Sequence, residues 1–144
     1  FTLRQLWGWE GKKVVFTNGV FDILHAGHVA LLQKSRKRGD ILIVGINTDA
    51  SARRLGKSPG RPVTRLADRA SILAALSCVD AVVSFNQDTP TELLSRLRPD
   101  ILIKGADYKT SQIAGAQYSG KVVRLPLKKG YSTTKLIERL QGLR

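Results

Sequence analysis

Apolar residues gather in five short runs along the chain, at 13–18, 41–46, 80–85, 100–104 and 121–126. The run over 41–46 is continuously apolar and does not alternate with polar residues. Continuous runs of this length are typical of strands that are covered on both faces. The pattern therefore predicts five strands inside a layered structure.

Between these runs the apolar residues take on helical spacing, over about 27–38, 48–55, 66–77, 89–97 and 133–141. Thr48, Thr89 and either Ser132 or Thr133 stand where a helix N-cap is expected. Strands that alternate with helices predict βαβ units, and right-handed crossovers then give a doubly wound parallel sheet. The sequence thus predicts an α/β fold of Rossmann-like type, which binds ligands beyond the carboxyl ends of its strands.

Two stretches lie outside this alternation. Residues 1–12 predict a short helical lead-in, whose Trp7 and Trp9 are more typical of packing anchors than of ligand contacts. Gly56–Pro62 holds two glycines, two prolines and two positive charges, so it predicts a loop that could close over a substrate. We expect residues 1–144 to form one domain.

The chain is strongly basic, with a formal charge of +13. Its last 44 residues carry nine Lys and Arg against two acids, a local balance of +7. This charge implies an anionic partner, either a nucleic acid or a phosphorylated small molecule. The basic residues have no series of aromatic residues for base stacking beside them, because aromatics make up only 6% of the chain. A solvated basic surface around a phosphate site is therefore the favoured interpretation.

No apolar run approaches the roughly 20 residues that a membrane span needs, and no secretory signal pattern opens the chain. We therefore expect a cytoplasmic protein without a membrane partner. The sequence contains no methionine, so we also expect it to be a segment of a longer product.

The two histidines of the chain, His25 and His28, lie three positions apart after the first predicted strand. Gly27 between them permits close approach of a ligand to the backbone, and His28 is expected in the first turn of a helix. Two imidazoles and the N–H groups of a helix N-terminus suit a polyphosphate. A metal site is an alternative, although no third ligand lies close by in the sequence. Neither a P-loop nor a G-x-G-x-x-G pattern is present.

The stretch Thr17–His28 resembles the signature of the HxGH nucleotidyltransferases, a superfamily that includes the cytidylyltransferases. Within it, the chain is similar to adenylyltransferases that make ADP-heptose from D-glycero-β-D-manno-heptose 1-phosphate. The similarity rests on an ordered set of segments over about residues 12–141: Val44–Ser51, Arg61–Pro62, Leu66–Arg69, Asp88–Pro90, Arg98–Tyr108 and Gly130–Thr134. Val20 departs from many relatives, which carry cysteine there, so that side chain is not expected to be catalytic.

The resemblance implies roles for residues in these segments. His25 and His28 would contact the nucleotide phosphates and stabilise the transition state, with Lys104 as a third catalytic residue. Ser132, Thr133 and Thr134 match a second family signature that holds the β- and γ-phosphates, although Ser132 or Thr133 could simply be an N-cap. The remaining nucleotide-binding candidates are Asn18, Gly19, Val20, Phe21, Gly27, Gly105 and Asp107. Asp107, like Lys104, fits either a nucleotide or a metal contact.

Five residues are candidates for contacts to the second substrate. Asp22 could face the sugar phosphate, and Asn47 could touch the substrate. Lys57 and Arg69 are candidate anion contacts, although a loop lysine and an arginine on a helix surface are equally expected to be solvated. Asp49 could touch substrate or cap a helix.

The implied substrates are ATP with Mg²⁺ and a sugar 1-phosphate, with no dedicated metal site on the protein. A homodimer is open, with an apolar interface from Phe85 or the N-terminal tryptophans, and so is a heptose 7-phosphate kinase, fused or separate. Two alternative functions also stay open. The first is a cytidylyltransferase for an alcohol phosphate such as glycerol 3-phosphate, and the second is a basic nucleic-acid-binding module.

Overall fold

The computed structural model describes residues 2–56, 58–106 and 113–143. Five parallel strands form one sheet in the order β3-β2-β1-β4-β5. Each strand coincides with one of the predicted apolar runs to within one residue at either end: β1 (Val14–Gly19), β2 (Ile41–Asn47), β3 (Ala81–Phe85), β4 (Ile101–Gly105) and β5 (Lys121–Leu125). The predicted doubly wound parallel sheet is therefore confirmed.

The predicted helices are also present, with small shifts at their ends. Their bounds are α1 (Leu3–Leu6) in the lead-in, α2 (Ala26–Arg36), α3 (Asp49–Arg54), α4 (Leu66–Ala74), α5 (Thr91–Leu97), the 3₁₀ turn η2 (Ala116–Tyr118) and α6 (Thr133–Gln141). Thr48 and Ser132 cap α3 and α6 through their hydroxyls, as expected. The predicted cap at Thr89 is wrong, because Pro90 occupies the N-cap position of α5.

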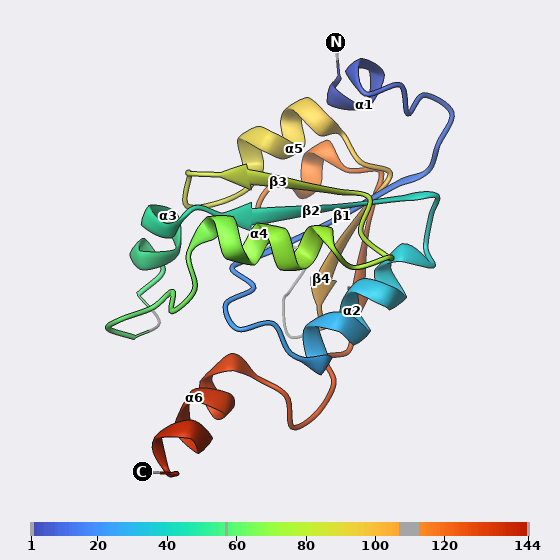
Figure 1. The fold of residues 1–144 in the computed structure, drawn as a ribbon. Helices are drawn as coiled ribbons and strands as arrows, with labels where there is room; N and C mark the ends of the chain where they lie inside the picture. The colour runs from blue at the N-terminus through green and yellow to red at the C-terminus, as the bar shows by residue number, and fades with distance from the viewer. Residues whose placement is uncertain (1, 57, 107–112, 144) are drawn as a thin grey trace.

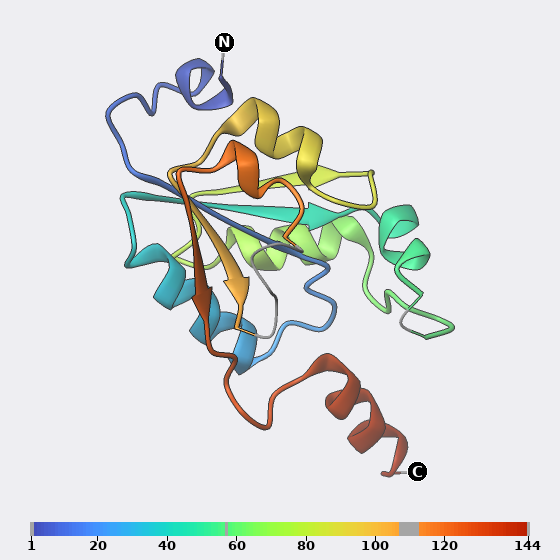
Figure 2. The same ribbon diagram turned by 180° about the vertical axis from the view of Figure 1, so that it is seen from behind.

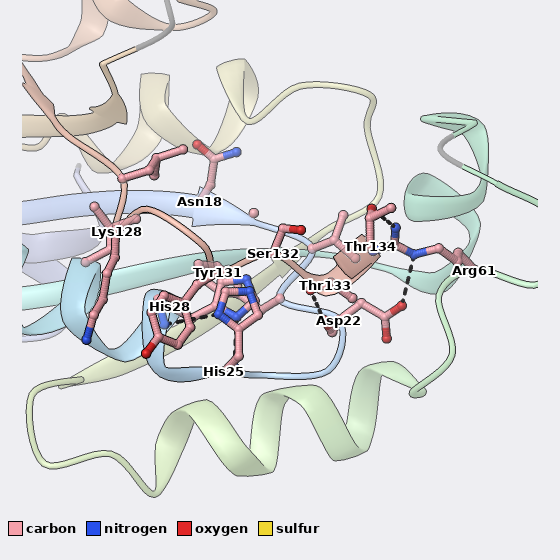
Figure 3. A pocket seen from close by; sticks show the side chains of 16 residues that line it. Asn18, Asp22, His25, His28, Arg61, Lys128, Tyr131, Ser132, Thr133 and Thr134 are labelled. Carbon is pink, nitrogen blue, oxygen red and sulfur yellow. Dashed lines mark hydrogen bonds and ion pairs between the residues drawn. The ribbon is translucent and has the colours of Figure 1, made fainter. Parts of the chain in front are cut away.

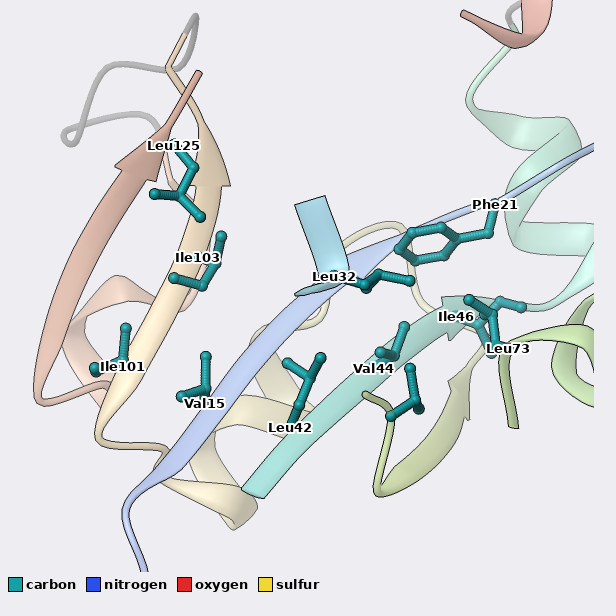
Figure 4. Close-up of a cluster of buried hydrophobic side chains, with 11 residues drawn as sticks. Val15, Phe21, Leu32, Leu42, Val44, Ile46, Leu73, Ile101, Ile103 and Leu125 are labelled. Atoms are coloured by element: carbon teal, nitrogen blue, oxygen red, sulfur yellow. The ribbon is translucent and has the colours of Figure 1, made fainter. Parts of the chain in front are cut away.

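Two apolar clusters hold the layers together, one on each face of the sheet. Figure 4 shows the first, in which Leu32 of α2 and Leu73 of α4 pack on strand residues such as Val44. On the other face, Leu94 and Leu97 of α5 pack on strand residues such as Val14, Phe16 and Ile43. Both faces of the central strands are thus buried, which explains why their sequences are continuously apolar.

The central strand β1 pairs with β2 on one side and with β4 on the other. The chain winds outward from β1 to β3 and then returns to β4, so the direction of winding reverses between β1 and β4. Ligands of such sheets bind at this point, beyond the carboxyl ends of the strands. In Figures 1 and 2, α6 extends away from the layered body at this end of the sheet.

None of the described helices is long and apolar enough to cross a membrane.

Candidate functional site

The loop after β1 turns sharply before α2 begins. Phe21 and Ile23 adopt positive φ angles of 54° and 52°, a conformation that non-glycine residues rarely take. His25 is the N-cap of α2, and His28 lies in its first turn as predicted. The loop and the helix start thereby bring both histidines to the carboxyl end of β1.

The two histidines form a reciprocal capping arrangement. The backbone N–H of Gly27 donates to Nδ1 of His25 at 3.1 Å, and the backbone N–H of His25 donates to Nδ1 of His28 at 3.1 Å. A neutral imidazole that accepts at Nδ1 carries its proton at Nε2. Both rings are therefore fixed as Nε2–H donors, the form that can hydrogen-bond to a phosphate oxygen.

The electrostatics of the pair favour neutral rings. The ring centroids of His25 and His28 lie 3.8 Å apart with the planes inclined by 24°. Burial lowers the pKa of His25 below its ordinary value. The lowered pKa favours the neutral form of His25 at pH 7, and two stacked imidazolium ions would repel each other.

Gly27 is required by close packing at this point. A Cβ on Gly27 would lie 2.8 Å from Cβ of Tyr131 and 2.9 Å from Cε1 of His25. Both distances are shorter than non-bonded carbon atoms allow. The missing side chain thus lets the segment before α6 approach the start of α2.

The start of α6 forms the opposite wall. The hydroxyl of Ser132 accepts from the backbone N–H of Lys135 at 3.0 Å. The hydroxyl of Thr133 donates to the carbonyl oxygen of Asp22 at 2.6 Å, and that of Thr134 accepts from Nη1 of Arg61 at 3.2 Å. Two side chains of α6 are therefore tied to other loops of the site.

Asp22 connects these loops. Its carboxylate accepts hydrogen bonds from the backbone N–H groups of Val63 and Thr64, from the hydroxyl of Thr64 and, at 3.5 Å, from Nε of Arg61. Burial by itself would raise the pKa of the Asp22 carboxyl, but these donors outweigh burial and leave the pKa below its ordinary value. Asp22 is thus a charged anchor for the segment from Arg61 to Thr64.

A cavity of about 320 Å³ lies between these segments. Figure 3 shows the side chains around it, with the two histidines near the centre of the view and Lys128 and Arg61 toward opposite ends. The structure brings most of the predicted residues together in its lining: Asn18, Gly19, Val20, Phe21, Asp22, His25, Gly27, His28, Ser132, Thr133 and Thr134.

Comparison with known proteins agrees with this geometry. The family model described as cytidylyltransferase-like matches residues 16–139, which include both histidines and the start of α6. The chain belongs to the cytidylyltransferase-like family. This confirms the resemblance drawn from the sequence, and membership in a family of nucleotidyltransferases implies a nucleotide substrate.

Several curated members of the family are named "Bifunctional protein HldE". The protein from Syntrophotalea carbinolica is 55% identical over 91% of this chain, and the one from Magnetococcus marinus is 52% identical over 94%. These matches cover only 27% and 28% of the two relatives' own length. A crystal structure of the "lipopolysaccharide core biosynthesis protein" from Thermoplasma volcanium GSS1 is 31% identical, with a TM-score of 0.71, over 83% of this chain and 100% of that one.

Lys104 lies at the carboxyl end of β4 and reaches the cavity through Asn18, whose side-chain oxygen accepts from its ammonium at 2.5 Å. Burial lowers the pKa of Lys104 to about 8. Gly105 ends the same strand and, like Lys104, is outside the cavity lining. The predicted Asp107 and Lys57 lie outside the described residues.

The expectations for Arg69 need correction. Its side chain is 1% exposed, and its guanidinium donates to the carbonyl oxygens of Thr64, Val20 and Asn47 and to the carboxylate of Asp49. It is therefore buried among protein acceptors and lies outside the cavity lining, which supports neither a solvated side chain nor a contact to a substrate anion. Helical position does not reveal this burial, because the loops that cover Arg69 come from other parts of the sequence.

Asn47 and Asp49 also hold the protein together. Asn47 is 3% exposed and donates to the hydroxyl of Ser51. Asp49 accepts from the backbone N–H of Leu66 at 3.0 Å, which is the first residue of α4. Neither residue lines the cavity, so the expected substrate contacts are not supported.

Sequence reasoning missed five residues of the cavity lining: the apolar Leu31 and Leu127, and the polar or charged Arg61, Lys128 and Tyr131. The ammonium of Lys128 lies 4.8 Å from the ring centroid of Tyr131. The ring centroids of Tyr131 and His25 lie 6.3 Å apart. Arg61 and Tyr131 belong to the segments that carried the family resemblance, which was the available signal. Lys128 had no such signal.

No group of three or more His, Cys, Asp or Glu side chains that could hold a metal ion occurs among residues 2–56, 58–106 and 113–143. Asp22, the carboxylate in the cavity lining, already accepts four hydrogen bonds.

Proposed function

We propose that this domain transfers AMP from ATP to D-glycero-β-D-manno-heptose 1-phosphate and so forms ADP-heptose and pyrophosphate. The observation that carries the proposal is the paired histidine cap of α2, which fixes two Nε2–H donors at one cavity. The start of α6, with Ser132 and Thr134, lines the same cavity. The ADP-heptose resemblance and the relatives named HldE support the choice of substrate.

The site suits a polyphosphate for two physical reasons. The N-terminus of α2 carries partial positive charge, which favours phosphate oxygens. Arg61 and Lys128 add full positive charges to the lining of the cavity. Two polyanionic substrates repel each other, and these charges reduce the cost of bringing them together.

In this mechanism a phosphate oxygen of the sugar 1-phosphate attacks the α-phosphorus of ATP. The bond from the α-phosphorus to the oxygen that bridges to the β-phosphorus breaks, and its electron pair leaves with pyrophosphate. The second pKa of a phosphate monoester is about 6, so the nucleophile is already ionised at pH 7 and needs no general base. Catalysis then depends on orientation and on stabilisation of charge.

The residues of the chain divide this work. Nε2–H of His25 and of His28 donate to the phosphate oxygens that gain charge in the transition state. Lys104 holds the side chain of Asn18 and, while protonated, adds positive charge near the carboxyl end of β1. Mg²⁺, bound to the nucleotide, would supply further neutralisation of the phosphate charge.

Two other functions are less well supported. A cytidylyltransferase for glycerol 3-phosphate would share the histidine site, but the ordered segments of the chain are closer to the ADP-heptose branch. A nucleic-acid-binding module would explain the basic charge but not the paired histidine donors.

The proposal also covers the cellular location and the protein partners of the domain. We place the reaction in the cytoplasm, with a heptose 7-phosphate kinase as partner, since the relatives are named as bifunctional and this chain matches about 27–30% of their length. A homodimer stays a prediction. Phe85 is 5% exposed, so any such interface would rely more on Trp7, which is 36% exposed.

The first experiment measures pyrophosphate release by the purified domain with Mg²⁺ and each pairing of ATP or CTP with heptose 1-phosphate or glycerol 3-phosphate. We expect release with ATP and heptose 1-phosphate alone. Release with CTP and glycerol 3-phosphate would support the cytidylyltransferase alternative. If no pairing gives release, and binding to DNA or RNA weakens steeply with salt, the nucleic-acid module would replace the enzyme.

A further inference from the structure

Arg61 joins three segments of the site. Its Nε lies 3.5 Å from the carboxylate of Asp22, and its Nη1 donates to the hydroxyl of Thr134 at 3.2 Å. The side chain is 13% exposed and lines the main cavity. The loop before α4 thereby contacts both the loop after β1 and the start of α6.

These contacts leave part of the guanidinium able to serve a ligand. An arginine has five N–H donors in a planar fork, and two of them have partners among the described residues. The two contacts come from different sides, so they hold the plane of the guanidinium in a defined orientation at the cavity. A planar fork with oriented donors matches the oxygens of a phosphate group.

The reaction itself requires two separate anion positions. In an in-line displacement, the attacking oxygen and the leaving oxygen lie on opposite sides of the phosphorus atom. The proposed α-phosphate position is next to His25 and His28, and Figure 3 shows Arg61 and Lys128 on opposite sides of these rings. One cation is therefore placed for the incoming phosphate and the other for the departing pyrophosphate.

We propose that Arg61 binds the phosphate of the acceptor substrate, while Lys128 serves the β- and γ-phosphates of the nucleotide. Arg61 is assigned to the acceptor because it contacts Asp22, the residue expected to face the sugar phosphate, on the side of the histidines away from Lys128. Its second contact, to Thr134 at the start of α6, places the acceptor phosphate next to the helix that is expected to hold the nucleotide phosphates. Lys128 lies five residues before Thr133, the first residue of α6, and its ammonium lies over the ring of Tyr131, which also faces the ring of His25. This inference rests on the proposed function, since it assigns the two substrates of that reaction to two ends of one cavity.

The test compares Arg61→Gln with Lys128→Gln in steady-state kinetics, with the second substrate saturating. Arg61→Gln should raise KM for heptose 1-phosphate about 10- to 100-fold, the loss expected for a charged hydrogen bond, and change KM for ATP less than about threefold. Lys128→Gln should raise KM for ATP and leave KM for heptose 1-phosphate nearly unchanged. The rise should be smaller than for Arg61→Gln because Lys128 is exposed. An equal rise in both KM values for Arg61→Gln, or a rise for ATP alone, would overturn the assignment.

Matched controls separate this effect from charge and folding. Arg65→Gln and Lys129→Gln remove the same charge from exposed residues outside the cavity lining and should leave both KM values unchanged. Glutamine at position 61 can still donate to Asp22 or Thr134, so the fold should persist. Arg61→Lys keeps the charge without the fork and should give an intermediate KM for the acceptor.

A binding measurement decides the point even if heptose 1-phosphate proves to be the wrong acceptor. The melting temperature is measured with and without inorganic phosphate, in the presence of saturating α,β-methylene-ATP, which occupies the nucleotide site without being cleaved. Phosphate should stabilise the wild-type protein and Arg65→Gln but not Arg61→Gln. Equal stabilisation of all three proteins would refute the role of Arg61, whereas failure of the proposed function would appear as absent turnover in the wild type.

Discussion

Helices α2 and α6 both direct their N-termini at the cavity, but they are attached to the protein in different ways. Leu32 and Ser35 of α2 are fully buried, and Leu32 belongs to the core cluster on the sheet. In the described part of α6, Thr133 is the one buried residue, and Leu140 remains 59% exposed. Packing therefore positions α2, whereas α6 is held near the site mainly through polar contacts at its first turn.

This difference predicts unequal stability within one site. Segments with few buried apolar contacts open at a lower free-energy cost than segments in the core. The histidines should therefore stay in place without substrate, because their helix is part of the core. The residues at the start of α6 should gain order when a polyphosphate binds between the two helices.

The largest effect is expected from His28→Ala, which removes a donor from the packed half of the site. We expect kcat to fall by about 10²–10³, as for other donors that stabilise a developing oxyanion. The fold should survive, since Leu32 and the rest of the α2 core contact are untouched. The measurement is pyrophosphate release together with thermal unfolding, and an active, well-folded variant would contradict the assigned role of the histidine.

Gly27→Ala tests the close contact between the start of α2 and the segment that precedes α6. The added Cβ would meet Tyr131 and the ring of His25, so we expect kcat/KM to fall by about tenfold or more and the free energy of unfolding to fall by about 1–3 kcal/mol. Gly142→Ala is a suitable control, because the nearest atoms to its added Cβ lie at 3.6 Å. Kinetics and denaturant unfolding of the two variants would show whether the close approach matters.

Thr133→Val removes one hydrogen bond between α6 and the loop after β1. The hydroxyl donates to the carbonyl oxygen of Asp22, and a hydrogen bond of this kind contributes about 1 kcal/mol. We expect KM for ATP to rise about fivefold and amide hydrogen exchange in α6 to accelerate, while exchange in α2 stays the same. Thr133→Ser keeps the hydroxyl and should behave like the wild type; equal exchange in all three proteins would argue against the weak attachment of α6.

The smallest expected effect is the pH dependence of kcat/KM, which concerns Lys104 at the end of β4. The pKa of Lys104 is lowered to about 8, so the ammonium loses its proton as pH rises past this value. We expect kcat/KM to fall about threefold between pH 7.5 and 8.5 in the wild type. Lys104→Arg stays charged and should lose this alkaline fall; persistence of the fall would assign it to another group.

Stability should change in the opposite direction over this range. The folded pKa of Lys104 lies below its unfolded value of about 10.4, so the unfolded chain binds more protons between about pH 8 and 10.4. The contribution of Lys104 to the free energy of unfolding therefore rises with pH across this window. Thermal melts of the wild type and Lys104→Arg at several pH values would isolate it.

Sequence reasoning succeeded where neighbours along the chain decide the outcome. The apolar run over 41–46 predicted a buried strand, and His25 and His28 fell at the helix start because a strand, a turn and a helix follow one another directly. It failed for Arg69, which looked like a surface residue of a helix. Four acceptors from three separate segments surround its guanidinium, and no local pattern reports such contacts.

The sequence by itself determined the parallel α/β sheet, the family and the histidine pair, because hydrophobic periodicity and short motifs are local properties of a chain. Only the tertiary structure decided which charges belong to the cavity. Asp22 binds the backbone of Val63, about 40 residues further along the chain, and Arg61 donates to Thr134, about 70 residues further along. The fold brings these segments together at the carboxyl end of the sheet. The role of a charged side chain depends on the partners and the water that surround it, and the fold sets both.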